Sequence, residues 1–409
     1  MRAQVAVCVQ AELVPDRERA ARDLLEQVRV DDFGATGAVH FARAFVLDEV
    51  IDNDGQPIPA SVVYMADVDG SADDHLRALP PDIDTLFEQC VGYPSAPGAP
   101  GASSAQARLA WLHEHSLRPA AYYRHTVGRT VEQVRREAYL REQVEEVLDG
   151  VERTAADEIA RTVYRAIKGR PDLSWAIQRP WTPGWTYVVP RIAALVAIAF
   201  AVLLALPFVV AFLIAWLLVV RVLELRDTQE SGPVDVAHID AVRRHEDRGV
   251  QNPFTGVGFV KPGIVRRLTM RGALLGLDLG FRLVMYRDNL TGVRTIHFAR
   301  WQPVDGGRRF IFASAYDGNL ESYMDDFISR LAWGINLVFS NGVGFPRARW
   351  LIFGGAKDEI AYKHYLRRHL VPTSVFYSAY PALAAIHIDR NAEVRRALRA
   401  QDPRWLEAM

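Results

Sequence analysis

An unbroken apolar run near the middle of the chain limits the possible folds more than any other feature. From Ile192 to Val220 the sequence contains no charged residue, and Arg191 and Arg221 bound the run. As one helix this run is about 43 Å long, against about 30 Å for the hydrocarbon core of a bilayer. The core of a soluble domain does not need such a segment, so the run predicts insertion into a membrane, with lipid as its partner.

Two geometries are compatible with the run, because Pro207 lies close to its centre. A tilted or kinked single span places the flanking parts of the chain on opposite sides of the bilayer. A re-entrant hairpin that bends at Pro207 returns both parts to one side. Positive side chains on both flanks favour the hairpin, with both flanking parts on the cytoplasmic side of the cell membrane. These are Lys168, Arg170, Arg179 and Arg191 before the run, and Arg221 and Arg226 after it.

The parts of the chain before and after the run share four motifs in the same order, about 250 residues apart. The motifs are HFAR (40–43 and 297–300), Asp-Gly (69–70 and 317–318), VGYP or VGFP (91–94 and 343–346) and a tyrosine-containing segment (117–128 and 370–381). Four markers in one order indicate an internal duplication. We therefore expect a first unit at 1–165, a membrane anchor with its linkers at 166–249, and a second unit at 250–409.

The hydrophobic patterning of both units predicts the α+β fold class. Each unit shows the order strand, helix, strand, strand, helix, strand, with residues 73–90 expected as one helix. This is the ferredoxin-like order, in which helices cover one face of a sheet. The other face needs a partner, so we expect the two tandem units to pair as an α+β barrel pseudo-dimer. The predicted helix Ile264–Arg287 has more apolar surface than one sheet contact needs, which indicates either burial between the units or contact with lipid or a lipophilic ligand.

Composition and motifs narrow the classes of function. The net charge is −1 at pH 7, which does not favour binding to nucleic acid. The two cysteines, Cys8 and Cys90, have no metal-binding or redox spacing and fit either a reducing compartment or one disulfide. The amino terminus has no continuous apolar stretch of the kind found in signal peptides. The sequence contains no phosphate-binding loop, nucleophile elbow, zinc motif or haem-attachment motif, so it predicts no metal site.

The second unit carries polar residues that the first lacks, and any working site is expected there. His297 beside a carboxylate of Asp317 or Glu321 suits acid–base chemistry, provided that burial moves the carboxyl pKa towards neutrality. Regular alternation along a strand places His297 and Arg300 on opposite sheet faces, unless a bulge intervenes. The structural alternative is that His297 bridges groups within the sheet and Arg300 pairs with a carboxylate. The candidate catalytic residues are His297, Arg300, Asp317, Glu321 and Tyr323.

The duplicated order resembles the dimeric α+β barrel superfamily, which includes dye-decolorising peroxidases, chlorite dismutase-like proteins and small monooxygenases. The peroxidases also duplicate this unit, and their Gly-x-x-Asp-Gly signature carries the distal aspartate. This chain keeps the Asp-Gly in "SAYDG" and "ADVDG", with Ser314 and Ala66 in place of the first glycine, and its apolar insertion departs from the peroxidase pattern. The resemblance implies a haem pocket with a histidine ligand, for which His297 is the candidate.

Two hypotheses for the function remain. The first is a membrane-anchored oxidoreductase, peroxidase-like or monooxygenase-like, that acts on a lipophilic substrate entering from the bilayer. The second is a non-catalytic membrane adaptor whose paired sheets bind a lipid or a partner protein. The polar residues confined to the second unit favour the first hypothesis, and the missing catalytic motifs favour the second. Either protein could be an oligomer.

Overall fold

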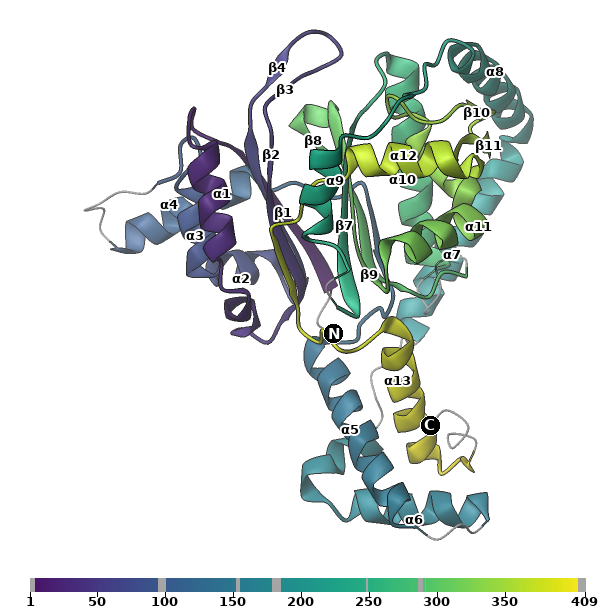
Figure 1. Ribbon diagram of the computed structural model, residues 1–409. Helices are drawn as coiled ribbons and strands as arrows, with labels where there is room; N and C mark the ends of the chain where they lie inside the picture. The colour runs from purple at the N-terminus through teal and green to yellow at the C-terminus, as the bar shows by residue number, and fades with distance from the viewer. Residues whose placement is uncertain are drawn as a thin grey trace.

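Two four-stranded antiparallel sheets form the centre of this mixed α+β protein (Figure 1). The structure is a computed structural model that describes residues 4–94, 101–151, 155–178, 185–247, 249–285, 290 and 292–403. Sheet 1 has the order β1 (Gln4–Glu12), β5 (Ser61–Asp69), β2 (Val39–Leu47) and β12 (Val375–Ser378). Sheet 2 has the order β7 (Gln251–Phe259), β9 (Arg309–Asp317), β8 (Ile296–Val304) and β6 (Ala121–Arg124). The described strands form no closed sheet.

Each sheet takes its fourth strand from the other half of the chain. Strand β12 pairs with β2, where Phe376 lies opposite Arg43, and β6 pairs with β8, where Tyr122 lies opposite Arg300. The two sheets correspond strand by strand, which agrees with the duplication that the sequence predicts. Because each half completes the sheet of the other, the two halves are interlocked through backbone hydrogen bonds.

Helices cover the outer faces of the two sheets, and the inner faces pack against each other. Phe45 and Met65 of sheet 1 contact Ile311 and Ala313 of sheet 2 in one apolar cluster. The helices on sheet 1 are α1 (Glu18–Gln27), α2 (Ala72–Arg77), α3 (Pro81–Phe87) and α4 (Gly101–Glu114). The single helix expected at 73–90 is two helices, because the consecutive prolines at 80–81 end one and begin the next. Both cysteines are buried and free.

A helical extension projects from the sheets (Figure 1). It contains α5 (Val131–Asp149), α6 (Ala156–Lys168) and α13 (Ala385–Ala400), packed around Leu140, Val163 and Val394. Helices α5 and α13 each follow an exchanged strand, and they lie side by side. The two halves are therefore joined a second time, outside the sheets.

The apolar run forms two helices, α7 (Trp185–Leu204) and α8 (Leu206–Glu224), which follow one another end to end (Figure 1). Among the described residues, α8 is the one helix long and apolar enough to cross a membrane, judged by length and composition. At Ala205 the backbone bends (φ −95°, ψ 8°), but the Ala205 and Val209 amides still donate four residues back. The reversal expected at Pro207 is therefore a bend at Ala205, and Pro207 sits in the first turn of α8, where its missing N–H costs little. The flanking Arg179 lies outside the described residues.

Both helices of this bent rod contact the same helix, α10 (Ile264–Leu283). Arg191 Nε donates to Arg282 O at 3.0 Å, and Trp216 Nε1 donates to Thr269 Oγ1 at 3.0 Å. The rod covers about 37 Å between these contacts and α10 covers about 20 Å, and the bend at Ala205 together with the long side chains of Arg191 and Trp216 spans the difference. Its apolar side chains are exposed along most of its length, Phe208 to 79%.

Candidate functional site

His297 and Asp317 form a buried pair that the first unit repeats. His297 Nε2 lies 2.7 Å from Asp317 Oδ1, and Asp317 Oδ2 accepts from the N–H of Ala385, the first residue of α13, at 2.7 Å. In the first unit, His40 Nε2 lies 3.1 Å from Asp69 Oδ1, and Asp69 Oδ2 accepts from the first N–H of α5 at 2.8 Å. Each aspartate therefore holds the start of the helix that follows an exchanged strand, which gives the repeated motif a structural role.

A β-bulge places His297 on the inner face of sheet 2. The pairing of β8 with β9 shifts between Ile296 and Phe298, and that of β2 with β5 shifts at the matching histidine. The rings of His297 and Phe298 both pack on Phe41 of the other sheet, with centroids 5.3 and 5.6 Å away. Strict alternation, which put His297 and Arg300 on opposite faces, fails because the bulge adds one residue. Both side chains thus reach the space between the sheets.

Arg300 and Arg43 cross between the two sheets in matched positions. Both guanidinium groups are buried, and each donates to two backbone carbonyls of the opposite sheet. Arg300 also pairs with Asp67, so the structural alternative for Arg300 is confirmed. The carbonyl acceptors are Val7 O (2.7 Å) and Ala66 O (2.9 Å) for Arg300, and Phe254 O (2.7 Å) and Ser314 O (2.8 Å) for Arg43.

The other two candidates lie away from His297. Glu321 is half-exposed in the first turn of α11 (Leu320–Phe339) and forms ion pairs with Arg367 and Lys363 of α12 (Glu359–His369). Tyr323 is buried on the helix-covered face of sheet 2, with its hydroxyl 2.5 Å from Ser314 Oγ. Burial raises the pKa of Tyr323 well above its usual value. The structure therefore brings His297, Asp317 and Arg300 to one inter-sheet region, without Glu321 or Tyr323.

The surroundings of His297 do not fit a haem group. Its Nε2 faces the Asp317 carboxylate, and its ring lies between Phe41 and Tyr380, with centroids at 5.3 and 6.2 Å. None of the cavities described below reaches it. A haem ligand needs an open side for the macrocycle, and the packed aromatic rings fill that side of His297.

A narrow apolar cavity, open at one side, lies on the outer face of sheet 2, beneath α10 and α11, and its space is about 640 Å³ with the open mouth included. Its walls are aromatic and aliphatic side chains, with almost no polar surface. Phe281 of α10, Trp301 of β8 and Phe327 of α11 lie on three sides, and Gly334 of α11 leaves part of the wall open. Such a space suits the hydrocarbon part of a ligand.

A second apolar cavity of about 420 Å³ lies beside the first and shares Phe254, Phe312, Phe339 and Leu366 with it. His369 is the one histidine among the residues that line the two cavities. Its Nδ1 lies 2.8 Å from Tyr365 O, so this nitrogen carries the proton and Nε2 keeps a lone pair. Burial lowers the pKa of His369, which keeps the ring neutral.

One wall of this cavity was predicted from the sequence. The surplus apolar surface expected on Ile264–Arg287 is present, since Leu277 and Phe281 of α10 line the cavity while Leu275 is 60% exposed. The contribution of α11 was missed. The sequence signal for this contribution is the spacing of Phe327, Leu331 and Ile335, which lie four residues apart and so share one face of the helix.

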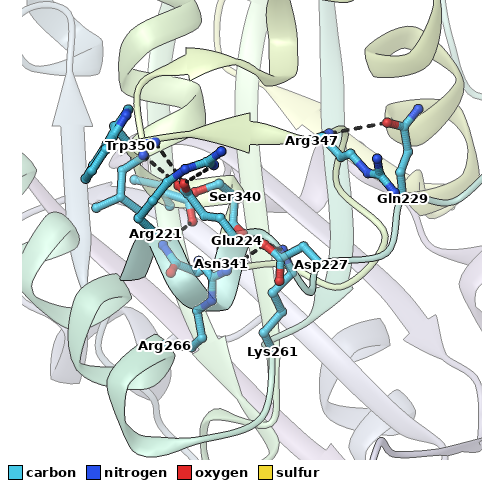
Figure 2. A network of polar contacts seen from close by, with 12 residues as sticks. Arg221, Glu224, Asp227, Gln229, Lys261, Arg266, Ser340, Asn341, Arg347 and Trp350 are labelled. Atoms are coloured by element: carbon cyan, nitrogen blue, oxygen red, sulfur yellow. Dashed lines mark hydrogen bonds and ion pairs between the residues drawn. The ribbon is translucent and has the colours of Figure 1, made fainter. Parts of the chain in front are cut away.

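A buried carboxylate fixes the end of α8 to the second unit (Figure 2). Glu224, with 1% of its side chain exposed, accepts from the N–H groups of Trp350 and Leu351 at 2.8 and 2.7 Å and from Arg221 at 3.0 Å. Trp350 and Leu351 both have positive φ angles, 55° and 64°, which turn two successive amides towards one anion. The charge pattern of the flanks predicted a role for the arginines at this end of the run but none for Glu224.

Comparison of the chain with protein-family models, curated proteins and solved structures gives no match. Function is therefore inferred from the geometry and chemistry of this chain alone.

Proposed function

We propose that this protein is a membrane-anchored lipid-binding protein that holds the hydrocarbon part of a lipophilic molecule in the cavity beneath α10 and α11. The observation that carries the proposal is the apolar wall of that cavity beside α10, a helix that contacts the apolar rod near both of its own ends, at Thr269 and at Arg282. Apolar surface drives binding in proportion to the area removed from water. An acyl or isoprenoid chain fits a narrow apolar slot and can enter from the bilayer beside it.

We also propose the finer architecture in which the two units are tandem ferredoxin-like domains that pair as an α+β barrel pseudo-dimer. The matching strand orders, the exchanged fourth strands and the paired roles of Arg43 and Arg300 support it. Both units would lie on the cytoplasmic side of the cell membrane. The positive residues at both ends of the rod, Arg191 and Arg221, support that orientation.

Filling the cavity at Gly334 is expected to remove bound lipid. A Cβ atom added at Gly334 meets no atom within 4 Å, so Gly334→Leu projects a side chain into the cavity without a clash at its base. Native mass spectrometry of the detergent-purified protein should show bound lipid, reduced at least about fivefold in the variant. The loss of helical glycine should leave the fold intact or stabilise it by about 1 kcal/mol.

Gly272→Leu is the matched control for this variant. Gly272 lies within α10, is exposed, and likewise has open space around an added Cβ. Its replacement makes the same change in helix propensity without entering the cavity, so lipid occupancy should equal that of the parent. Equal occupancy in all three proteins, or no bound lipid in the parent, would refute cavity binding.

A second candidate function is a membrane-anchored oxidoreductase that acts on the lipophilic molecule. One observation favours it. His369 lines the second apolar cavity and uses Nδ1 for its hydrogen bond to Tyr365 O, so the lone pair of Nε2 is the one that suits a cofactor ligand. His369 would replace His297 as the haem ligand. The narrow cavity makes a hydrocarbon chain the better fit, because a macrocycle needs α10 and α11 to move apart.

Absorbance spectroscopy tests the oxidoreductase candidate. The protein purified after haem supplementation should show a Soret band that His369→Ala removes and His297→Ala retains, since only His369 lines the cavities. A protein without a Soret band, or a band that His369→Ala leaves unchanged, contradicts ligation by His369.

A further inference from the structure

A wide, open polar pocket, with about 720 Å³ of space including its mouth, lies where the apolar rod ends. It is formed by residues that follow α8, by the segment that leads into α10, and by Val343 and Gly344. Val260 and Gly342 line the second apolar cavity, and each directly precedes a residue of this pocket, Lys261 and Val343 respectively. The pocket therefore lies next to the apolar cavities and directly after the membrane segment.

Three positive side chains line this pocket against one carboxylate. Lys261 Nζ and Arg266 Nη2 lie 2.7 and 2.5 Å from Asp227 Oδ2, and Figure 2 shows both side chains directed towards this carboxylate. Arg226 is the third cation and is exposed. Two carboxylates near the pocket have other partners: Glu224 is paired with backbone amides and Arg221, and Glu230, which lies against Gly344, is 3.9 Å from Arg368. The lining thus has two positive charges in excess.

Two further features point to an anion as the ligand. The Arg266 side chain is 3% exposed, and its Nη1 has no hydrogen-bond partner among the described residues, which is costly for a buried charged group. The pocket also contains the start of α10, a 20-residue helix whose N-cap, Gly263, provides no side-chain cap. The amides of the first turn and the positive end of the helix dipole favour a negative ligand there.

The position of the pocket just beyond the apolar side chains of α8 indicates which kind of molecule carries the anion. Val222 and Leu225, at the end of α8, are 52% and 69% exposed, and Arg226 follows immediately. In a membrane the apolar side chains lie among acyl chains and the next residues lie among headgroups. We propose that this pocket binds the phosphate of an anionic phospholipid headgroup. The lipid source rests on the membrane association proposed above, whereas the anion site itself does not.

The test is calorimetric titration of protein in an uncharged, phosphate-free detergent. The ligands are dihexanoyl phosphatidic acid below its micelle concentration, dihexanoyl phosphatidylcholine and inorganic phosphate. We expect phosphatidic acid to bind at least about tenfold more tightly than the other two. Arg226→Gln and Lys261→Gln should each weaken that binding about tenfold, and Arg267→Gln, an exposed arginine of α10 outside the pocket, should not.

The outcomes separate the two proposals. Phosphatidic acid that does not saturate, or whose binding Arg226→Gln and Lys261→Gln leave unchanged, overturns the anion site. Inorganic phosphate that binds as tightly as phosphatidic acid, with the same response to the variants, overturns the lipid source. The Gly334→Leu variant changes only the apolar cavity. The amount of lipid that it retains therefore tests the cavity proposal separately from the titrations, which test the anion site. Arg226 is exposed, so its variant is expected to fold, and circular dichroism of each variant checks this.

Discussion

Replacing Arg300 with methionine is expected to lower the free energy of unfolding by about 3–5 kcal/mol, as when one partner of a buried ion pair is removed. Arg300 is the partner of Asp67, whose side chain is 6% exposed and whose other hydrogen bond is to the Tyr122 hydroxyl at 3.0 Å. Without Arg300, this carboxylate is left between the sheets with one donor. Denaturant unfolding in detergent, followed by circular dichroism, measures the loss.

The duplication supplies the controls for this experiment. Position 67 corresponds to Ala315 in the second unit, so Arg300→Met with Asp67→Ala should recover most of the lost stability. Arg43→Met should cost less, about 1–3 kcal/mol, because Arg43 donates to neutral acceptors only. Burial and the nearby charge of Arg300 lower the pKa of Arg43 to about 10, so this guanidinium stays charged at neutral pH but is less strongly stabilised as a cation than in water. If Arg300→Met and Arg43→Met lower the free energy of unfolding equally, the unpaired Asp67 carboxylate does not cause the larger loss expected for Arg300→Met.

The sequence predicted the duplicated elements but not the exchange of strands. The motif order predicted two repeated units, and hydrophobic periodicity, which is a local signal, predicted their strands and helices. The choice of sheet for β6 and β12 is not local. The tetrapeptides of these strands, Ala121–Arg124 and Val375–Ser378, alternate in the same way and fit the edge of either sheet. Contacts more than 150 residues away, such as Tyr122 with Arg300, decide between them.

The candidate site was predicted only in part for similar reasons. The sequence predicted His297 beside a carboxylate of either Asp317 or Glu321 and did not choose between them. The shared inner face of His297 and Arg300 depends on a bulge, which no residue type in "TIHFAR" signals. The apolar cavity depends on volume left unfilled between α10, α11 and sheet 2, and unfilled volume has no sequence pattern. Gly334 is a partial exception, since a glycine in a helix interior lowers helix stability and suggests a packing reason.

Labelling of engineered cysteines is expected to place both units on the same side of the membrane. Strands β6 and β12 are shared between the sheets, and units on opposite sides of a bilayer could not exchange them. Each separated sheet would lose one strand and expose unpaired backbone groups at its edge. The apolar run of 29 residues cannot cross the bilayer twice, because two helical crossings need about 40 residues. With both units on one side, we expect the run to stay within one leaflet, beside α10, with which it makes two hydrogen bonds.

The native Cys8 and Cys90 are buried, so the background reactivity is low. Glu114→Cys in the first unit and Lys357→Cys in the second, both exposed, should react with a membrane-impermeant maleimide in inside-out vesicles and not in intact cells. Leu204→Cys, at a position 68% exposed near the bend of the rod, should react in neither until detergent is added. Opposite accessibility of positions 114 and 357 would exclude the exchanged sheets as well as the single-leaflet anchor. If Leu204→Cys reacts with the impermeant reagent in either preparation, the bend is exposed to water. Acyl chains would then not shield the bend, which contradicts an anchor that ends within one leaflet.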